Sequence, residues 1–238
     1  APWLQPPERR DLGDGVVHHA VAVHGPDLIA RALSFRAQLE AWWGQRRARV
    51  VHVRSIFEGF PIAVHKERRC RWLVYEVNGL PSIELKYHYP QVAEDRELMG
   101  KLEAQERRCL EAADLVITPS PVTAAELCRR GALAERVEVI ANGVDEQRFA
   151  YRQPIWNGGR PLRLLYTGTM TTWQGVHHAI DALRLLLRDH PAELALVGPA
   201  RATQRRALLA HLAKLGIERQ VSYLEPVTQA ALVDHYRW

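Results

Sequence analysis

Short apolar runs alternate along the chain with longer segments whose apolar residues recur at helical spacing. In the first such segment, residues 28–42, apolar side chains repeat every three or four positions and predict a helix that faces a core. Strands alternating with helices of this length predict an α/β fold with parallel sheets and right-handed crossovers. The predicted strands are 16–23, 50–53, 72–77, 115–118, 137–140, 162–166, 194–197 and 221–224. The apolar stripe of the first helix consists of Leu28, Ala32, Phe35, Leu39 and Trp42, and further helices are predicted over 57–68 in part, 91–113, 175–188, 202–215 and 228–236.

The stretch from residue 115 to residue 149 organises this pattern. It holds an apolar strand, a helix and a second apolar strand that ends in a turn. Ser120 is a good N-cap, Pro121 suits the first helical position, and Gly131 suits the position after the helix that requires positive φ. Asn142-Gly143 is a strong turn signal, because both residues tolerate left-handed backbone angles. In open α/β sheets ligands bind at the carboxyl ends of strands, and this turn lies at such an end.

A change of composition divides the chain after this stretch. Residues 150–160 include Pro154, Asn157, Gly158 and Gly159, which is typical of a linker. We therefore predict a first domain over residues 1–150, a linker over 151–160 and a second domain over 161–238. The length of 238 residues accommodates two small domains.

The composition is that of an ordinary globular protein, with 47% hydrophobic and 25% charged residues. No run approaches the roughly 18 consecutive apolar residues of a membrane-spanning helix. Cys70, Cys109 and Cys128 are widely spaced, which fits reduced thiols in a cytoplasmic protein. The pairs His18-His19 and His177-His178 lack the i, i+4 spacing of metal ligands, so no metal site is expected.

The net charge of +5 is scattered, but basic doublets stand out at Arg46-Arg47, Arg68-Arg69 and Arg107-Arg108. Such doublets favour an anionic lipid surface or nucleic acid as a partner. A solvated surface is the more frequent explanation of such doublets, and we expect no nucleic-acid partner.

The stretch 115–149 also carries a resemblance to a known family. A strand, Pro-Ser, a helix and Gly131, then a strand closing in Asn142-Gly143-Val144-Asp145 with Phe149 a few residues on, resembles the interdomain segment of family 4 glycosyltransferases. An unrelated α/β protein with an Asn-Gly turn is the alternative. The resemblance implies the GT-B fold, with two Rossmann-like parallel-sheet domains. It also implies retaining transfer of a sugar from a nucleotide-sugar to a glycan, lipid-linked or small-molecule acceptor, with no metal or cofactor.

The resemblance further implies a place in cell-surface polysaccharide or glycoconjugate biosynthesis, in the cytoplasm, with peripheral contact at the inner face of the membrane left open. It implies that the chain lacks the first βα unit of the amino-terminal domain and that residues 161–238 form an incomplete carboxyl-terminal domain. The main catalytic carboxylates of relatives lie further along, so we expect the chain as given not to transfer sugar. The rival interpretations are a catalytically silent nucleotide-sugar-binding module and, with less support, a GT-B-like epimerase.

The predicted donor site lies between the first strand and first helix of the second domain, from Gly168 to Gly175. A strand, a glycine turn and a helix N-terminus form an anion site by geometry, although every βα unit has such a junction. Relatives carry an Arg and a Lys there, whereas this chain has Thr169 and Gln174. Hydroxyl and amide groups bind phosphate oxygens but do not neutralise their charge. The resemblance adds Gly198, Asn142 and Gly143 to the donor side, and Glu225 near the nucleotide base.

The predicted acceptor side lies at the carboxyl ends of strands in the first domain. Glu76 stands at the end of the predicted strand 72–77 and would bind a sugar hydroxyl or act in acid–base chemistry. Further acceptor-side candidates are Arg54, Glu58, Asn78, Gly79 and Glu84. For the charged residues, a role in helix capping or on the surface is the competing explanation.

Overall fold

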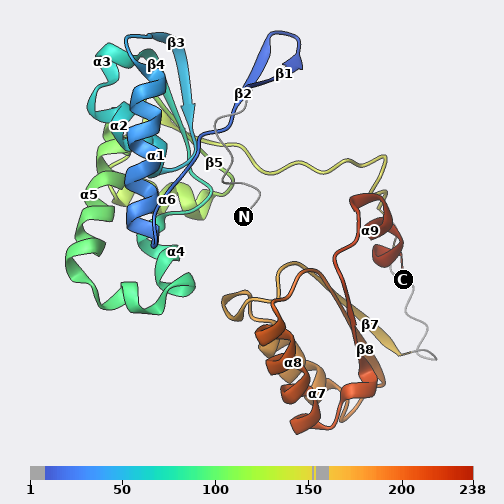
Figure 1. Ribbon diagram of the computed structural model, residues 1–238. Helices are drawn as coiled ribbons and strands as arrows, with labels where there is room; N and C mark the ends of the chain where they lie inside the picture. The colour runs from blue at the N-terminus through green and yellow to red at the C-terminus, as the bar shows by residue number, and fades with distance from the viewer. Residues whose placement is uncertain (1–8, 152, 154–160, 238) are drawn as a thin grey trace. The chain divides into compact units, whose positions relative to one another are not determined.

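A computed structural model describes residues 9–151, 153 and 161–237 of the chain. It divides into two compact units, Ala1–Asn142 and Gly143–Trp238, each built around its own parallel sheet (Figure 1). The predicted α/β class with two parallel-sheet units is therefore confirmed. Most of the predicted linker, residues 152 and 154–160, lies outside the described residues, and the predicted domain limits remain predictions.

The first unit contains a four-stranded parallel sheet in which each strand pairs with the next one along the chain. Its order is β3-β4-β5-β6, with Val53 opposite Tyr75 and Glu76 opposite Ile117. A separate antiparallel hairpin, β1-β2, precedes this sheet. The strands are β1 (Arg9–Gly13), β2 (Val16–His19), β3 (Ala48–Val53), β4 (Cys70–Glu76), β5 (Leu115–Thr118) and β6 (Val137–Val139). The helices are α1 (Leu28–Trp43), α2 (Ile56–Val64), α3 (Lys66–Arg69), α4 (Pro81–His88), α5 (Arg96–Ala112) and α6 (Pro121–Arg129), with 3-10 turns η2 (Pro90–Glu94) and η3 (Ala134–Arg136).

One face of this sheet forms the core of the first unit. Alternate residues of β3 and β4, such as Val53 and Tyr75, are buried against side chains of α2, α5 and α6. The other face is open among the described residues: Val50 and Trp72, paired in register, are 52% and 47% exposed. Successive right-handed crossovers place α2, α5 and α6 on the same face of the sheet, which explains why only the side chains of that face are buried.

Three predicted elements differ from the structure of the first unit. The strand predicted over 16–23 stops at His19 and pairs with β1, because Gly13, Asp14 and Gly15 adopt positive φ angles of 86°, 49° and 76° and close a hairpin. The helix predicted over 91–113 is broken at Asp95, whose carboxylate accepts the Leu98 N–H at 2.9 Å and starts α5.

The apolar stripe of the first helix is the third difference. Trp42 is 39% exposed, and the neighbouring Trp43 packs against the core in its place. The remaining members of the stripe are only half-buried. The helical spacing was correctly recognised, but it did not reveal how little of α1 reaches the core.

The organising stretch folds largely as predicted. Ser120 accepts the Thr123 N–H at 3.1 Å, Pro121 opens α6, and Gly131 has a φ of 111°. The segment around Gly143 is a correction: Gly143 does not have positive φ, and neither does Asn142. The left-handed turn predicted for Asn142-Gly143 is therefore wrong.

The second unit contains a three-stranded parallel sheet in the order β7-β8-β9. Its strands are β7 (Leu162–Thr167), β8 (Ala192–Val197) and β9 (Val221–Leu224), and its helices are α7 (Val176–Leu186), α8 (Ala202–Leu215) and α9 (Gln229–Tyr236), with 3-10 turns η4 (Thr172–Gln174) and η5 (Glu218–Gln220). The core side chains Ile180, Leu183, Leu196 and Leu208 come from α7, β8 and α8. Across the part of the chain that the structure describes, no helix is both long and apolar enough to cross a bilayer.

Candidate functional site

A cluster around Glu76 occupies the carboxyl ends of β3 and β4. Glu76 Oε1 accepts hydrogen bonds from Asn78 Nδ2 at 2.9 Å and from Arg54 Nε at 3.1 Å. His52 Nε2 lies 3.0 Å from Glu76 Oε2. Register explains this grouping, because Val53 pairs with Tyr75 and the flanking residues His52, Arg54 and Glu76 therefore share the opposite face. Three of the predicted acceptor-side residues are thus brought together.

The hydrogen bond from the Asn78 amide, together with the charge of Arg54, holds the pKa of Glu76 below its usual range. Glu76 is therefore a carboxylate at neutral pH, able to accept a proton or a hydrogen bond but not to donate one. His52 was missed in the sequence, although its i, i+2 spacing from Arg54 on a strand was a usable signal.

Replacing Asn78 tests this description of Glu76. We expect Asn78→Ala to raise the pKa of Glu76 towards the ordinary glutamate value, because the main cause of its depression is removed. A carboxyl-carbon NMR titration measures the shift directly. Asn142→Ala is the matched control and should leave the titration of Glu76 unchanged; a Glu76 pKa that is insensitive to Asn78→Ala would contradict the assignment.

Glu58 caps the beginning of α2. Its Oε1 accepts the backbone N–H groups of Arg54 and Ser55 at 2.8 and 2.7 Å, and its Oε2 accepts the Ser55 hydroxyl at 2.5 Å. This is a capping box, in which both carboxylate oxygens are already occupied. The geometry therefore shows that Glu58 caps a helix, which was the competing explanation for this residue. A part for Glu58 in acceptor binding remains a prediction.

The loop between β4 and α4 is tightly packed around Gly79. A Cβ atom on Gly79 would lie 1.8 Å from Glu84 Oε1, so the Glu84 carboxylate rests directly over the glycine. Val77 and Leu80, on either side, are fully buried. The loop that carries Asn78 is therefore fixed from both sides.

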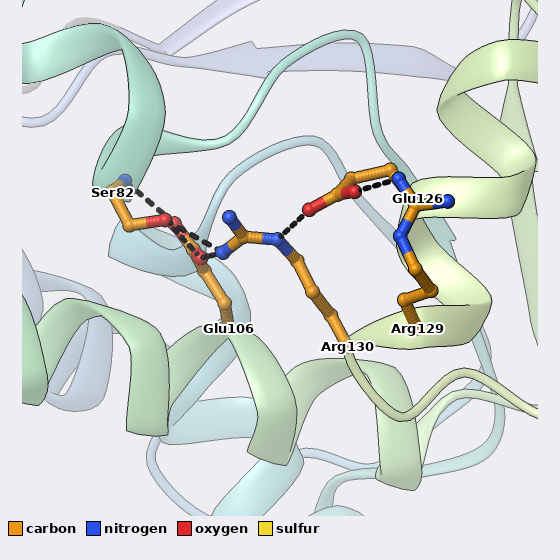
Figure 2. Close-up of polar contacts among 5 residues, drawn as sticks. All are labelled: Ser82, Glu106, Glu126, Arg129 and Arg130. Atoms are coloured by element: carbon orange, nitrogen blue, oxygen red, sulfur yellow. Dashed lines mark hydrogen bonds and ion pairs between the residues drawn. The ribbon is translucent and has the colours of Figure 1, made fainter.

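A buried ionic network anchors the far end of this loop (Figure 2). Glu106 of α5 is 1% exposed, and its Oε1 and Oε2 accept the Ser82 N–H at 2.7 Å and the Ser82 hydroxyl at 2.6 Å. Arg130 Nη1 donates to Glu106 Oε2 at 3.2 Å, and Arg130 Nε donates to Glu126 at 2.6 Å. Figure 2 shows the Arg130 guanidinium between the two carboxylates, with Arg129 on the outer side of Glu126.

Charges alternate in sign along this network from the interior towards the surface. Burial raises the pKa of Glu106, and the hydrogen bonds from Ser82 and the charge of Arg130 oppose that rise. A carboxylate at the first turn of α4 also faces the positive end of that helix. The network therefore fixes the start of α4, and with it the loop that follows Glu76. Sequence reasoning missed it, because Glu106 resembles any other polar residue of a long polar helix.

In the second unit, the predicted donor loop runs from Gly168 to Gly175 between β7 and α7. Gly168 has a φ of 154° and Gly175 a φ of 76°, and residues 172–174 form η4 between them. The Tyr166 hydroxyl donates to the Thr169 carbonyl at 2.8 Å and holds the loop against β7. No side chain of the described residues caps α7, whose N-cap is Gly175. The first N–H groups of α7 therefore lack a side-chain acceptor.

Gly198 brings the next loop against the first one. A Cβ atom on Gly198 would lie 2.0 Å from the Gly168 carbonyl oxygen, and Gly198 has a φ of 146°. The Tyr223 hydroxyl of β9 donates to the Gly198 carbonyl at 2.9 Å. Glu225, which follows β9, pairs with Arg205 at 3.2 Å. The predicted donor residues Gly168, Thr169, Gln174, Gly175 and Gly198 thus lie on one edge of the sheet.

The two remaining predicted donor-side residues are Asn142 and Gly143, and their part in donor binding stays a prediction. They follow β6, and the division between the two units passes between them. A Cβ atom on Gly143 would meet nothing within 4 Å, so this position has no special need for glycine. Within the described ranges, no group of three or more His, Cys, Asp or Glu residues could hold a metal ion.

Comparison with known proteins agrees with this arrangement. A profile described as Glycosyltransferase Family 4 matches residues 1–148. The chain is 30% identical over 91 residues to WcaL of Escherichia coli strain K12, a glycosyltransferase that its name provisionally assigns to colanic acid biosynthesis; the match covers 38% of this chain and 22% of WcaL.

Solved structures show the same fold at lower identity. Sucrose-phosphate synthase from Thermosynechococcus elongatus matches with a TM-score of 0.73 and 17% identity, covering 97% of this chain and 60% of that enzyme. Anabaena HepE in complex with UDP and glucose matches with a TM-score of 0.56 and 21% identity, covering 76% of this chain and 48% of HepE. The chain spans about a fifth of WcaL and three fifths or less of these enzymes.

Proposed function

Because the chain belongs to glycosyltransferase family 4, we propose that it takes part in retaining transfer of a sugar from a nucleotide-sugar to an acceptor. The acceptor is a glycan, a lipid-linked sugar or a small molecule, and the pathway is cell-surface polysaccharide or glycoconjugate synthesis. The name of WcaL and the UDP complex of HepE support this assignment. The observation that carries the proposal is the close backbone contact between the two glycine loops, one at Gly168 and one at Gly198.

The two glycine loops suit a nucleoside diphosphate. They bring backbone close to backbone at the carboxyl ends of β7 and β8, beside the N-terminus of α7. In open α/β sheets this edge is where ligands bind, and a helix N-terminus favours anions. Thr169 and Gln174 supply hydroxyl and amide donors to the phosphate oxygens. The nucleotide lies against the Gly168–Gly175 loop in this proposal.

The acceptor lies at the Glu76 cluster in the first unit. An ionised Glu76 accepts the hydrogen bond of a sugar hydroxyl and orients it, while Arg54 and Asn78 hold the carboxylate in place. We further propose that transfer uses no metal ion, with helix dipoles and hydrogen-bond donors taking the charge of the leaving group. A lipid-linked acceptor places the reaction at the cytoplasmic face of a membrane.

A second candidate, a catalytically silent nucleotide-sugar-binding module, is favoured by one observation. The loop from Gly168 to Gly175 contains neither Arg nor Lys, so no cation of the loop balances a departing nucleotide. Because the chain as given is not expected to transfer sugar by itself, the test uses the full-length protein. Its sugar transfer, measured with radiolabelled UDP-glucose and related donors in the presence of membrane lipid extracts, separates the two functions. Binding of UDP without any transfer would favour the silent module.

Gln174→Lys tests the donor half of the proposal. We expect it to strengthen UDP binding by about 1 kcal/mol, or roughly fivefold, because a charged donor replaces a neutral one beside the phosphates. Isothermal titration calorimetry measures the affinity, and Gln220→Lys, which makes the same charge change in η5 at the amino end of β9, is the control. Unchanged or weaker affinity in Gln174→Lys would place the phosphates elsewhere.

A further inference from the structure

The amino ends of β3 and β4 concentrate positive charge. Residues 42–49 and 65–72, which end α1 and form α3, contain seven Lys and Arg residues and a single acidic residue, Glu67. The whole chain has a net charge of only +5, so these two short segments hold more positive charge than the chain does on balance. We call this surface the basic edge and define it by Arg46, Arg47, His65, Lys66, Arg68, Arg69, Arg108 and Arg136.

Two adjoining hollows make the basic edge continuous. One hollow of about 170 Å³ is lined by Arg46, His65, Arg68 and Arg69. A larger hollow of about 470 Å³ is lined by basic residues from three elements and by three acidic residues on its wall. The basic residues are His65, Lys66, Arg68, Arg108 and Arg136, and the acidic ones are Glu67, Glu111 and Asp114. His65 and Arg68 line both, so residues from α3, α5 and η3 form one surface with the end of α1.

Much of this charge is not balanced by carboxylates. Lys66 pairs with Asp114 at 2.6 Å, and Arg69 pairs with Glu40. Among the residues that the structure describes, no carboxylate lies within 4.0 Å of the guanidinium groups of Arg46, Arg47, Arg68 or Arg108. These four exposed cations therefore have no carboxylate partner among those residues, and Arg46 donates instead to the Trp42 carbonyl.

Trp42 indicates what kind of anionic partner fits. Its indole is 39% exposed at the end of α1. Arg46 lies over the ring at 5.2 Å, and the rings of His19 and Trp43 approach it at 5.3 and 5.7 Å. These neighbours leave little ring face for stacking a nucleic-acid base, whereas an indole edge beside cations is typical of a residue at a membrane interface.

We propose that the basic edge binds the anionic surface of a phospholipid bilayer. The hollows receive headgroup phosphates, and the cations are attracted to the negative surface potential at distances within a Debye length. Figure 1 shows α3 and the beginnings of β3 and β4 at one end of the first unit and α4 at the other. Binding through the basic edge therefore leaves the Glu76 cluster, at the carboxyl ends of the strands, uncovered by lipid.

Vesicle co-sedimentation of the whole chain tests this proposal. We expect binding to vesicles of 30% phosphatidylglycerol in phosphatidylcholine, loss of binding at high salt, and little binding to pure phosphatidylcholine. The variant Arg47→Glu, Arg68→Glu, Arg108→Glu should bind at least about tenfold more weakly. The control Arg184→Glu, Arg188→Glu, Arg206→Glu changes the net charge equally with exposed residues of the second unit and should retain most of the binding.

Three results would overturn the proposal. The first is equal binding to neutral and anionic vesicles, and the second is equal loss in the two triple variants, which would show that only net charge matters. The third comes from a fluorescein-labelled RNA 20-mer: tight RNA binding that depends on Arg47, Arg68 and Arg108, without binding to vesicles, would assign the basic edge to nucleic acid.

Trp42→Ala should weaken vesicle binding severalfold while leaving its salt dependence intact, because it removes an interfacial ring and no charge.

Discussion

Glu106→Ala should destabilise the first unit by about 3–5 kcal/mol. The substitution removes the acceptor of the Ser82 N–H and hydroxyl and one partner of Arg130, all at a position that is 1% exposed. A buried N–H without an acceptor carries its full desolvation cost, and the lost side chain leaves a cavity. Urea unfolding followed by circular dichroism measures the change in free energy.

Two further variants separate the network from the helix that carries it. Glu103→Ala, on the exposed side of α5, should change the free energy of unfolding by no more than about 0.5 kcal/mol. Glu106→Gln keeps the shape of the side chain but places an amide N–H donor towards Ser82 or Arg130. Its loss of unfolding free energy should therefore fall between those of Glu103→Ala and Glu106→Ala. If Glu106→Ala were as mild as Glu103→Ala, Ser82 and Arg130 would have other partners and the network would not anchor α4.

Gly198→Ala should have the second large effect, of about 3 kcal/mol or more on the stability of the second unit. A methyl group there would lie 2.0 Å from the Gly168 carbonyl oxygen. This oxygen belongs to the backbone, so a change of side-chain rotamer cannot relieve the clash. The φ of 146° adds strain of its own, because side chains rarely adopt it. The two loops must separate, so UDP binding should fall together with stability.

Gly216→Ala is the matched control for this effect. Gly216 also has positive φ, 66°, but a Cβ atom there would meet nothing within 4 Å. The expected cost is about 1 kcal/mol, which is the backbone term alone. Equal thermal shifts in Gly198→Ala and Gly216→Ala would mean that the approach of the two loops contributes nothing to stability.

The local signals in the sequence were sufficient for most elements. Residues 115–118, 202–215 and 221–224 form the predicted elements with the predicted ends. The ends of such elements depend on neighbours in the chain. Gly216 ends α8, and in the same way Ser120 and Pro121 begin α6. The predicted family is confirmed by the profile match over residues 1–148, and it too rested on a local run of residues.

Features that depend on distant residues could not be predicted in this way. Ser82 and Arg130 are 48 positions apart, and they meet each other and Glu106 only after α4, α5 and α6 have packed. The spacing of His52 from Arg54 places both on one face of β3, but the contact of His52 with Glu76 also depends on the register between β3 and β4, which the sequence does not reveal. Asn142-Gly143 shows the reverse error, since a strong turn dipeptide lacks positive φ at the point where the chain passes from the first unit to the second.

The network in Figure 2 also has a consequence that we expect for synthesis of the protein on the ribosome. Glu106 is made 24 residues after Ser82, and Arg130 follows after another 24. Until Arg130 has left the exit tunnel, the nascent chain holds an acidic side chain without its cation at a site that must become dry. We therefore expect α4 to dock only after the end of α6 has been synthesised, so the loop that carries Asn78 should be among the last parts of the first unit to become ordered.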